Sequence, residues 1–501
     1  MKSNKTTVDC KWLPGRYVGL VCTVIGLLIV SCTTRSMRRI DQLSEVSSEQ
    51  DFQQALKTIR ESPKLYGELN RFLYWYDQGL LYHYLGEYDS SLYHLEQAEL
   101  VLDNLYARSV TNEAASLLTN DNIRPYRSRR FEQVLLHQFL SFNYLAGREP
   151  DESLVETRKM QLVFDRFKSK DRRTEKYNDD GMAHFISALV YQAQGDRDDA
   201  AIALYKSVSA YRGNGMGIPV LIRDYAYHQL KEAGRTHDID ELSLSPVSRS
   251  VYADSGYAAQ TEIILIGFAG RAPVLKESIF WGTFVHGGLL TGYYVEPDGD
   301  TLSTSIADPP IPPSELAKAR DGDKTGIGKT FHIKFALPAV VERESLTDHF
   351  KVYSDGSGDA KASSMISDIE YLLKKNIEDN RPTTLARTAV RVVLRTIAAQ
   401  KAKSEMETGN PLLNFLLSFG TDILTDQMEK ADTRLSLFLP RTIHITRIPV
   451  SPGTHTIRAA ACQRNGTVIK RRHFDNIEVK KGEKRFWFRA DESRKSGKDE
   501  G

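Results

Sequence analysis

The stretch of sequence that decides the fold reads Trp75-Tyr-Asp-Gln-Gly-Leu-Leu-Tyr-His-Tyr-Leu-Gly-Glu-Tyr-Asp-Ser-Ser-Leu-Tyr-His-Leu-Glu-Gln-Ala98. Trp75, Gly79 and Tyr82 follow one another at steps of four and three residues, which places them on one face of a helix. Gly79 is the small residue expected where two helices touch, and Gly86 is expected in the turn after the first helix. Small and apolar residues then return at helical spacing as far as Ala98. The stretch therefore predicts a helical hairpin.

The same spacing recurs further along the chain. A second full copy uses Ala188, Tyr191, Gly195 and Ala200, and its opening steps alone appear in Leu140, Asn143 and Gly147. This is the tetratricopeptide pattern, whose regular period is about 34 residues. The turn glycines lie 61 and 48 residues apart instead, so extra segments intervene, 106–130 among them. We expect an irregular TPR-like α-solenoid over 50–240, with a concave face of the kind that binds other proteins.

The second half of the chain has sequence patterns that are typical of β-strands. Strands are expected at 261–268, 280–290 and 331–338, with a surface loop over 297–329. Helical spacing follows at 365–377, 384–403 and 412–430, and alternating strands separated by turn residues begin at 442. The sequence predicts an α+β domain over 251–435, a C-terminal β region over 440–490 that forms a small β-sandwich, and a disordered tail at 491–501. The fold class is α+β, in several domains.

The N-terminus has the layout of an export signal. Basic residues precede an apolar run of 14 residues at 17–30, which is too short to span a bilayer. The run ends in Ile29-Val-Ser-Cys32, which resembles the lipobox of bacterial lipoproteins. We expect a signal peptide over 1–31, cleavage between Ser31 and Cys32, lipid on Cys32 and a polar tether over 32–49. A plain signal peptide and an unexported protein with an apolar N-terminus are the alternatives.

Charge and cysteine content fit an anchored, exported protein. The 501 residues carry 67 basic and 65 acidic groups; cleavage removes four basic residues and one acidic residue, which changes the net charge from +2 to −1. This balance gives no sign of nucleic-acid binding, which calls for a basic patch. Only Cys32 and Cys462 remain after cleavage, so no intramolecular disulfide is expected. By resemblance to the sorting rules of Gram-negative lipoproteins, Thr33 after Cys32, in place of Asp, favours the outer membrane facing the periplasm. Exposure on the cell surface stays open.

Motifs for catalysis, nucleotide binding and metal binding are incomplete or absent in this sequence. Gly326-Ile-Gly-Lys-Thr330 lacks the first glycine of a phosphate loop, because Asp323 stands at that position. His286-Gly-Gly288 is not accompanied by a nucleophile elbow, and the 12 histidines form no metal-binding motif. The sequence predicts no catalytic residue, no cofactor, no metal and no nucleotide, and so no enzyme. Paired carboxylates from distant segments are left open.

Several segments together resemble an uncharacterised family of bacterial TPR-like outer-membrane lipoproteins. They are Asn120-Asp-Asn122, Phe131-Glu-Gln-Val-Leu-Leu-His137, Asn143-Tyr-Leu145, Leu154-Val-Glu156, Gly270-Arg-Ala-Pro273, Leu337-Pro338, Ala431-Asp-Thr-Arg434, Leu439-Pro440 and Arg447-Ile-Pro449. The resemblance covers about 50–490 and implies an exported, lipid-anchored helical-repeat protein followed by an α+β module. It brings no catalytic residues. The last strands also resemble PEGA-type surface β-domains.

Three functions are compatible with these features. The first is a lipid-anchored periplasmic adaptor that binds protein partners of a cell-envelope machine through its helices. The second is a protein that binds or processes cell-wall peptidoglycan or glycan through 251–490, and the third is a purely structural lipoprotein. The partner, the source organism, the oligomeric state and the role of Cys462 stay open.

Overall fold

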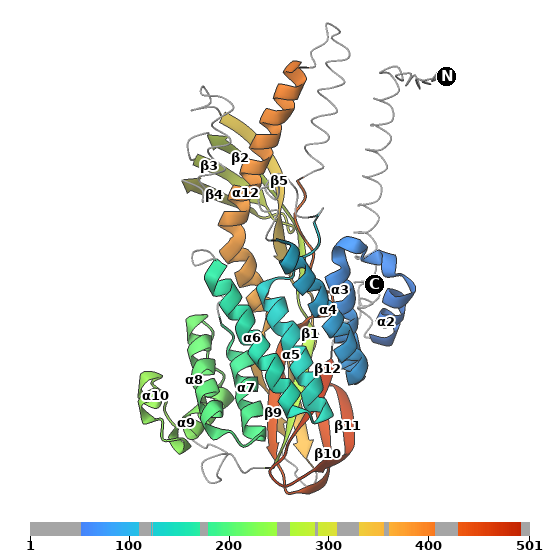
Figure 1. The fold of residues 1–501 in the computed structure, drawn as a ribbon, viewed down its shortest axis with the longest axis vertical. Coiled ribbons are helices and arrows are strands. Elements are labelled where there is room, and N and C mark those ends of the chain that lie inside the picture. Colours follow the sequence, from blue (N-terminus) through green and yellow to red (C-terminus); the bar gives the residue numbers. More distant parts are fainter. Residues whose placement is uncertain are drawn as a thin grey trace, which may run out of the picture.

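A computed structural model of the chain describes residues 52–109, 122, 124–170, 179–247, 261–285, 289–307, 330–354, 360–405 and 429–491. Helices and three small sheets make up these residues, and the helices lie side by side along the sheets in an elongated molecule (Figure 1). Ser31, Cys32, the predicted signal peptide and the tether lie outside the described residues. The same holds for all but the end of the predicted helix at 412–430.

Helical hairpins form the first part of the described chain. Helix α2 (Phe52–Glu61) and the short turns η2 (Pro63–Leu65) and η3 (Glu68–Asn70) lead into α3 (Arg71–Leu85) and α4 (Tyr88–Ser109). The following pairs are α5 (Arg130–Gly147) with α6 (Pro150–Lys170), α7 (Gly181–Ala193) with α8 (Arg197–Gly213), and α9 (Val220–Glu232) with α10 (Thr236–Glu241). The three predicted hairpins are confirmed, and the α9–α10 pair is a further one that the repeat pattern does not show.

Residues with a left-handed backbone conformation occupy the hairpin turns. Gly86 and Gly195 both have φ of 83°, a conformation that glycine adopts without the steric penalty of a Cβ. In the middle hairpin Gly147 is the last residue of α5, and Arg148 takes the left-handed position with φ of 66°. The turn expected at Gly147 is therefore made one residue later.

Two four-stranded sheets form a β-sandwich. The first has the order β12 (Lys484–Asp491), β1 (Glu262–Arg271), β9 (Pro440–Pro449) and β8 (Ser364–Asp368), with β1 parallel to β12 and antiparallel to β9. The second has the order β11 (Val468–Val479), β10 (Gly453–Cys462), β6 (His349–Ser354) and β7 (Lys361–Ala362). Ile263 and Leu265 of β1 share a buried cluster with Val352, Ile457 and Phe474 of the second sheet.

This sandwich does not follow the predicted division into 251–435 and 440–490. Strands β1, β6, β7 and β8 come from the first range and share both sheets with β9–β12 from the second. The reason is that every residue of β1 is buried, so this apolar strand needs hydrogen-bonded neighbours on both edges and cover on both faces. Only the last strands of the chain complete that environment.

A third sheet stands beside the sandwich, with the order β4 (Thr301–Ala307), β3 (Leu289–Val295), β2 (Val274–Val285) and β5 (Thr330–Val341). Helix α12 (Ile369–Glu405) lies along it, where Leu385 and Ala389 pack against Phe280 and Phe335 (Figure 1). Two predictions are wrong here. Thr301–Ala307 is a strand within the predicted loop, and the two helices expected at 365–377 and 384–403 are one helix that continues through Pro382.

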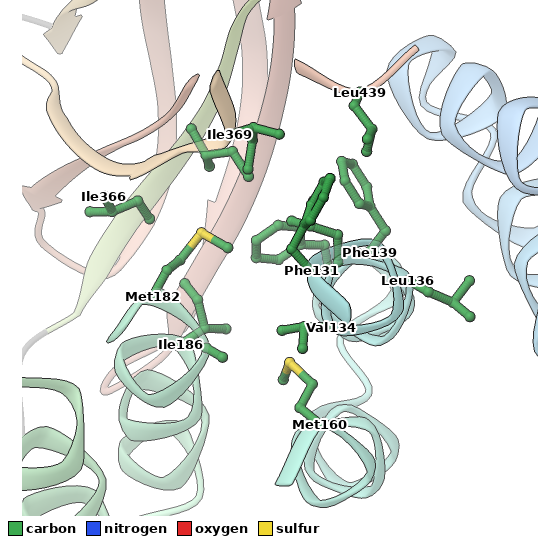
Figure 2. Close-up of a cluster of buried hydrophobic side chains, with 14 of the residues drawn as sticks. Phe131, Val134, Leu136, Phe139, Met160, Met182, Ile186, Ile366, Ile369 and Leu439 are labelled. Carbon is green, nitrogen blue, oxygen red and sulfur yellow. The ribbon is translucent and has the colours of Figure 1, made fainter. Parts of the chain in front are cut away.

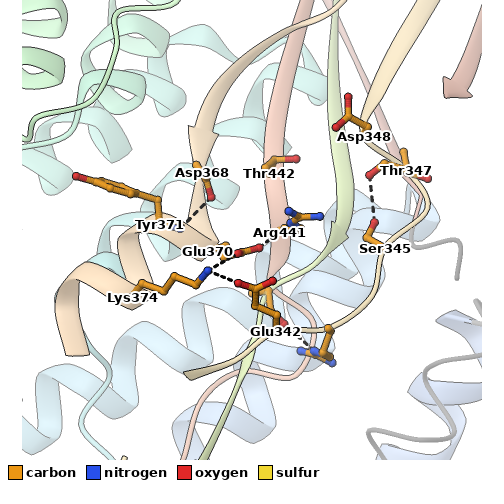
Figure 3. A network of polar contacts seen from close by, with 12 residues as sticks. Glu342, Ser345, Thr347, Asp348, Asp368, Glu370, Tyr371, Lys374, Arg441 and Thr442 are labelled. Atoms are coloured by element: carbon orange, nitrogen blue, oxygen red, sulfur yellow. Dashed lines mark hydrogen bonds and ion pairs between the residues drawn. The ribbon is translucent and has the colours of Figure 1, made fainter. Parts of the chain in front are cut away.

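Polar contacts hold the first turn of α12 against the sandwich (Figure 3). The Asp368 carboxylate accepts the Tyr371 N–H at 2.9 Å, while Glu370 accepts hydrogen bonds from Lys374 and Arg441, each at 2.7 Å. Burial raises the pKa of Glu370, but the hydrogen bond from Lys374 and the charge of Arg441 outweigh it and hold that pKa below its usual value. These contacts fix the first turn of α12 against the sandwich. Because α12 also packs on the third sheet, they help to orient that sheet relative to the sandwich.

One continuous core joins the helices to the first sheet. Figure 2 shows Phe131 and Phe139 of α5 and Met182 and Ile186 of α7 gathered with Ile366, Ile369 and Leu439 of the sheet region. The helical array and the α+β module therefore bury their apolar surfaces against each other.

Candidate interaction surfaces of the helical array

The inner face of the helical array, formed by α3, α5, α7 and α9, packs on the first sheet. Helices α3 and α5 contact β12, and α7 contacts β8. Helix α9 contacts the sheet through Tyr225, whose ring centre lies 4.0 Å from Cζ of Arg447 on β9. Arg447 in turn forms a bidentate ion pair with Glu262 on β1, at 2.8 and 2.9 Å. Residues of the same chain therefore cover the face that was expected to bind a partner.

The segment 431–439 fills the space between α3 and α5. Asp77 of α3 accepts a hydrogen bond from the Ser436 hydroxyl at 2.5 Å and another from the Tyr66 hydroxyl at 2.7 Å. Tyr84 of α3 donates to the carbonyl of Phe438 at 2.8 Å. Burial raises the pKa of Asp77 to about 7, although the hydrogen bonds from Ser436 and Tyr66 oppose that shift. The Asp77 carboxylate, which lies on the inner face of the array, therefore binds segment 431–439 of the same chain.

The motif Ala431-Asp-Thr-Arg434 has a structural role in this contact. The Arg434 guanidinium donates to Asp432 and to the carbonyl of Arg124 at 2.8 Å, and it lies 5.2 Å from the centre of the Tyr126 ring. Tyr126 in turn donates to Glu132 of α5 at 2.5 Å. This motif fastens the linking segment to the array.

The residues of the repeat pattern build the array itself. Ala98, Ala188 and Ala200 are fully buried, Tyr82 is buried, and Trp75 and Tyr191 are half-buried against the main core. Gly79 lies so close to α4 that an added Cβ would stand 2.5 Å from Cδ2 of Leu95. Gly86 and Gly195 occupy turns. These positions set the spacing of the helices, and the structure does not gather them into a site.

The outer face of α4 and α6 is the exposed side of the array. Two large apolar side chains of α4 and two of α6 are largely exposed there: Tyr93 (54%), Leu100 (53%), Val155 (43%) and Leu162 (62%). Lys159 of α6 pairs with Glu99 of α4 at 2.9 Å and so holds the two helices side by side. We call the surface made by Tyr93, Leu100, Val155 and Leu162 the outer surface. The sequence shows that these positions are apolar, but only the packing of the helices shows that they face outward.

The open face of the third sheet carries a second exposed group. Trp281 (42% exposed) and Tyr293 (43%) are cross-strand partners on β2 and β3. The Lys334 ammonium lies 4.5 Å from the centre of the Trp281 ring, in cation–π contact. Flat aromatic rings on a sheet offer a stacking platform. We call Trp281, Tyr293 and Lys334 the aromatic platform.

Two groups of acidic and histidine side chains have metal-ligand spacing in the described part of the chain. The first, Glu99, His137 and Glu156, already surrounds the Lys159 ammonium, which lies 2.9 Å from Glu99 and 3.0 Å from Glu156. A metal ion would have to displace that charge. The second, His237, Asp238 and Glu241, lies on the short helix α10, with His237 and Glu241 exposed. Neither group argues for a metal centre.

The fold and these surfaces define a helical-repeat protein whose inner face is closed by its own β-sandwich. No protein-family model matches the chain, and no curated protein matches it. Two solved structures are similar to part of this chain over most of their own length. A crystal structure of MamA is 12% identical, covering 40% of this chain and 88% of that one, at a TM-score of 0.25. A second crystal structure of MamA protein is 16% identical, covering 42% and 98%, at a TM-score of 0.23. At these TM-scores the similarity supports no conclusion about fold or function.

None of the described helices combines the length and apolarity needed to cross a bilayer. Cys462, whose role the sequence leaves open, is buried in β10, and burial raises the pKa of its thiol.

Proposed function

We propose that this protein is a lipid-anchored adaptor of the bacterial cell envelope, held at the outer membrane through Cys32 and facing the periplasm. It binds a protein partner through the outer surface and carries out no catalysis. The observation that carries the proposal is the contrast between the two sides of the array: the inner face is covered by the chain's own first sheet and segment 431–439, whereas the outer surface leaves large apolar side chains in water.

The size of this exposed group fits a contact surface. Burying one fully exposed large apolar side chain is worth about 1.5–3 kcal/mol. Each of these four is about half exposed, so each offers roughly half of that value to an interface. The Glu99–Lys159 ion pair links α4 to α6. A partner that presents an apolar patch would cover these side chains with little rearrangement of the array.

Crosslinking in membranes followed by affinity capture tests the partner surface. We expect Leu100→Glu combined with Leu162→Glu to abolish capture of a partner that the wild type captures. Leu302→Glu, an equally exposed leucine on the edge strand β4, is the matched control and keeps the partner. Capture by the double variant at wild-type yield would exclude the outer surface.

Labelling with a lipid precursor tests the anchor. Cys32→Ser removes the sulfur that would carry the acyl chain, so we expect an unlabelled product that is unprocessed or released from the membrane. Unchanged labelling of the variant would refute the assignment of Cys32.

The aromatic platform favours a second candidate function, the binding of cell-wall glycan. Sugar rings stack on exposed Trp and Tyr faces, and Lys334 adds a hydrogen-bond donor. The test is co-sedimentation of the purified protein with peptidoglycan. This function predicts that Trp281→Ala with Tyr293→Ala abolishes sedimentation, whereas Tyr93→Ala on α4 does not. A wild-type protein that stays in the supernatant would exclude it.

A further inference from the structure

Positive charge gathers on the face of the second sheet that points away from the first sheet. Val352 of β6 and Ile457 and Ala459 of β10 belong to the cluster buried between the two sheets. Successive side chains along a strand point to opposite faces, so Lys351 on β6 and Arg458 on β10 point outward. Arg458 is exposed and Lys351 is half-buried. The outward face of this sheet therefore carries cations from two neighbouring strands.

Strand pairing brings a third cation to the same face. Ala460 of β10 pairs with Lys351 on β6 and with Arg471 on β11, so these two side chains flank it in one row across the sheet. Arg471 is exposed, whereas Ala460 is only 1% exposed, as expected where long basic side chains lie over a small one. Burial raises the pKa of the Cys462 thiol, two residues further along β10, and the charges of Lys351 and Arg471 both oppose that shift. We call Lys351, Arg458 and Arg471 the basic face.

The three side chains of the basic face form no ion pair with another residue in the described part of the chain. The guanidinium of Arg458 instead lies 5.8 Å from the ring centre of Tyr353, its partner on β6. Lys470 and Arg472 add exposed positive charge at the open edge of the same sheet, because β11 is its edge strand. The whole chain carries 67 basic and 65 acidic groups, so this local excess does not reflect an overall one. Overall charge balance therefore does not detect it.

This arrangement suits a surface with many phosphates better than a single anion. The three cations come from neighbouring strands, which lie about 4.8 Å apart, and they stand on an open sheet face instead of converging on one point. An anionic bilayer presents phosphates across a plane, and each Lys or Arg near it strengthens binding about fivefold. Nucleic acid also presents many phosphates, but the export-signal layout of the N-terminus favours the membrane.

We propose that the basic face contacts the headgroups of anionic phospholipids in the membrane that carries the protein. This inference rests on the proposed function, because an anchor at Cys32 holds the face near the bilayer at a high effective concentration. The first sheet lies between the helices and the second sheet, since it shares one buried cluster with each. Contact through the basic face therefore turns the helical array, with its outer surface, away from the membrane and toward a partner.

Vesicle sedimentation tests the proposal with the full-length chain carrying Cys32→Ser, so that no acyl chain contributes to binding. The protein is mixed with vesicles of phosphatidylcholine alone or of phosphatidylcholine with phosphatidylglycerol. We expect about tenfold or tighter binding to the anionic vesicles, since three cations at about fivefold each exceed that factor. High salt should remove the difference, because the Debye length falls from about 10 Å at 0.1 M to about 3 Å at 1 M. Equal binding to both kinds of vesicle would overturn the proposal.

A variant with three substitutions ties the preference to the basic face. Lys351→Gln, Arg458→Gln and Arg471→Gln together remove the charges but keep part of each side chain over the sheet. We expect the preference for anionic vesicles to fall about tenfold or more. Circular dichroism shows whether the variant is folded, and a folded variant with wild-type preference would exclude the basic face.

The control variant combines Arg60→Gln, Arg127→Gln and Lys206→Gln. It removes the same number and kinds of charge at exposed positions in and beside the helical array, so we expect it to keep the preference. A control that loses as much preference as the first variant would mean that only net charge matters, which also overturns the proposal.

Competition with glycerol 3-phosphate distinguishes a membrane from a soluble phosphate. A single phosphate in water gains little from one exposed cation, so at millimolar concentration we expect no release from the vesicles beyond that caused by sodium chloride of equal ionic strength. Specific release would assign the face to a soluble phosphate instead. None of these variants changes the outer surface, and lipid labelling tests the anchor separately, so failure here leaves the adaptor proposal standing.

Discussion

At the scale of single residues, Gly79 shows how one missing side chain sets the distance between two helices. An added methyl group would stand 2.5 Å from Cδ2 and 2.6 Å from Cγ of Leu95, inside van der Waals contact. We expect Gly79→Ala to lower the free energy of unfolding by about 1–3 kcal/mol, the usual effect of overpacking. Urea denaturation measures it. Gly213→Ala is the control, because nothing lies within 4 Å of the added atom. Equal stability of the two variants would contradict close packing at Gly79.

Asp77 is expected to make stability depend on pH. Its folded-state pKa is raised to about 7 from 3.8, so between about pH 4 and 7 the folded protein holds a proton that the unfolded chain has lost. The contribution of Asp77 to stability is therefore most favourable below pH 4 and falls as pH rises to 7. Asp77→Asn removes this titration.

Denaturation of the wild type and Asp77→Asn at several pH values tests this dependence. The difference between their free energies of unfolding should shift in favour of the variant as pH rises, by at most about 1.4 kcal/mol per pH unit. Glu132, whose pKa is also raised by burial, interacts with Asp77 through its charge, so the difference between the two proteins includes this coupling. A difference that stays constant from pH 4 to 7 would show that Asp77 titrates normally.

At the scale of elements, local spacing predicted the helical hairpins because each one pairs residues close in sequence. The sandwich could not be divided correctly from sequence, because β1 takes both neighbours from the far end of the chain, as in the pairing of Glu262 with Lys484. Strand β4 was missed because the range 297–329 that contains it is rich in Pro, Asp and Gly, and only its pairing with β3 shows it to be a strand. The candidate surfaces depend on which side of a helix or sheet is covered, and periodicity alone does not give that.

The two faces of β3 give a prediction at this scale. Tyr294 is 4% exposed and packs on Phe280 at 5.3 Å, whereas its neighbour Tyr293 is 43% exposed on the opposite face. We expect Tyr294→Ala to lower the free energy of unfolding by about 3–5 kcal/mol and Tyr293→Ala by less than about 1 kcal/mol. Chemical denaturation of both variants checks this. Similar losses would mean that α12 does not cover that face of the sheet.

At the scale of the whole molecule, the helical array depends on the α+β module. Phe139 and Phe142 of α5 lie against Phe268 and Phe488 of the first sheet, with ring centroids 5.2–6.0 Å apart. An isolated fragment 50–247 would expose these rings to water. We expect it to aggregate or to bind a hydrophobic dye strongly, whereas the full-length protein does neither. A soluble fragment with a cooperative thermal transition would show that the array folds alone.

The parallel pairing of β1 with β12 has a consequence for biogenesis. Strand β12 is the last described strand and β1 the first of the sheet that covers the helices, so the core cannot close before β12 is available. Contacts between residues so distant in sequence slow folding, because a long loop must be ordered first. A newly made chain would therefore keep the apolar side of its helices exposed until residues 484–491 have been made, and a product truncated before residue 484 would be a substrate for proteases rather than a shorter working protein.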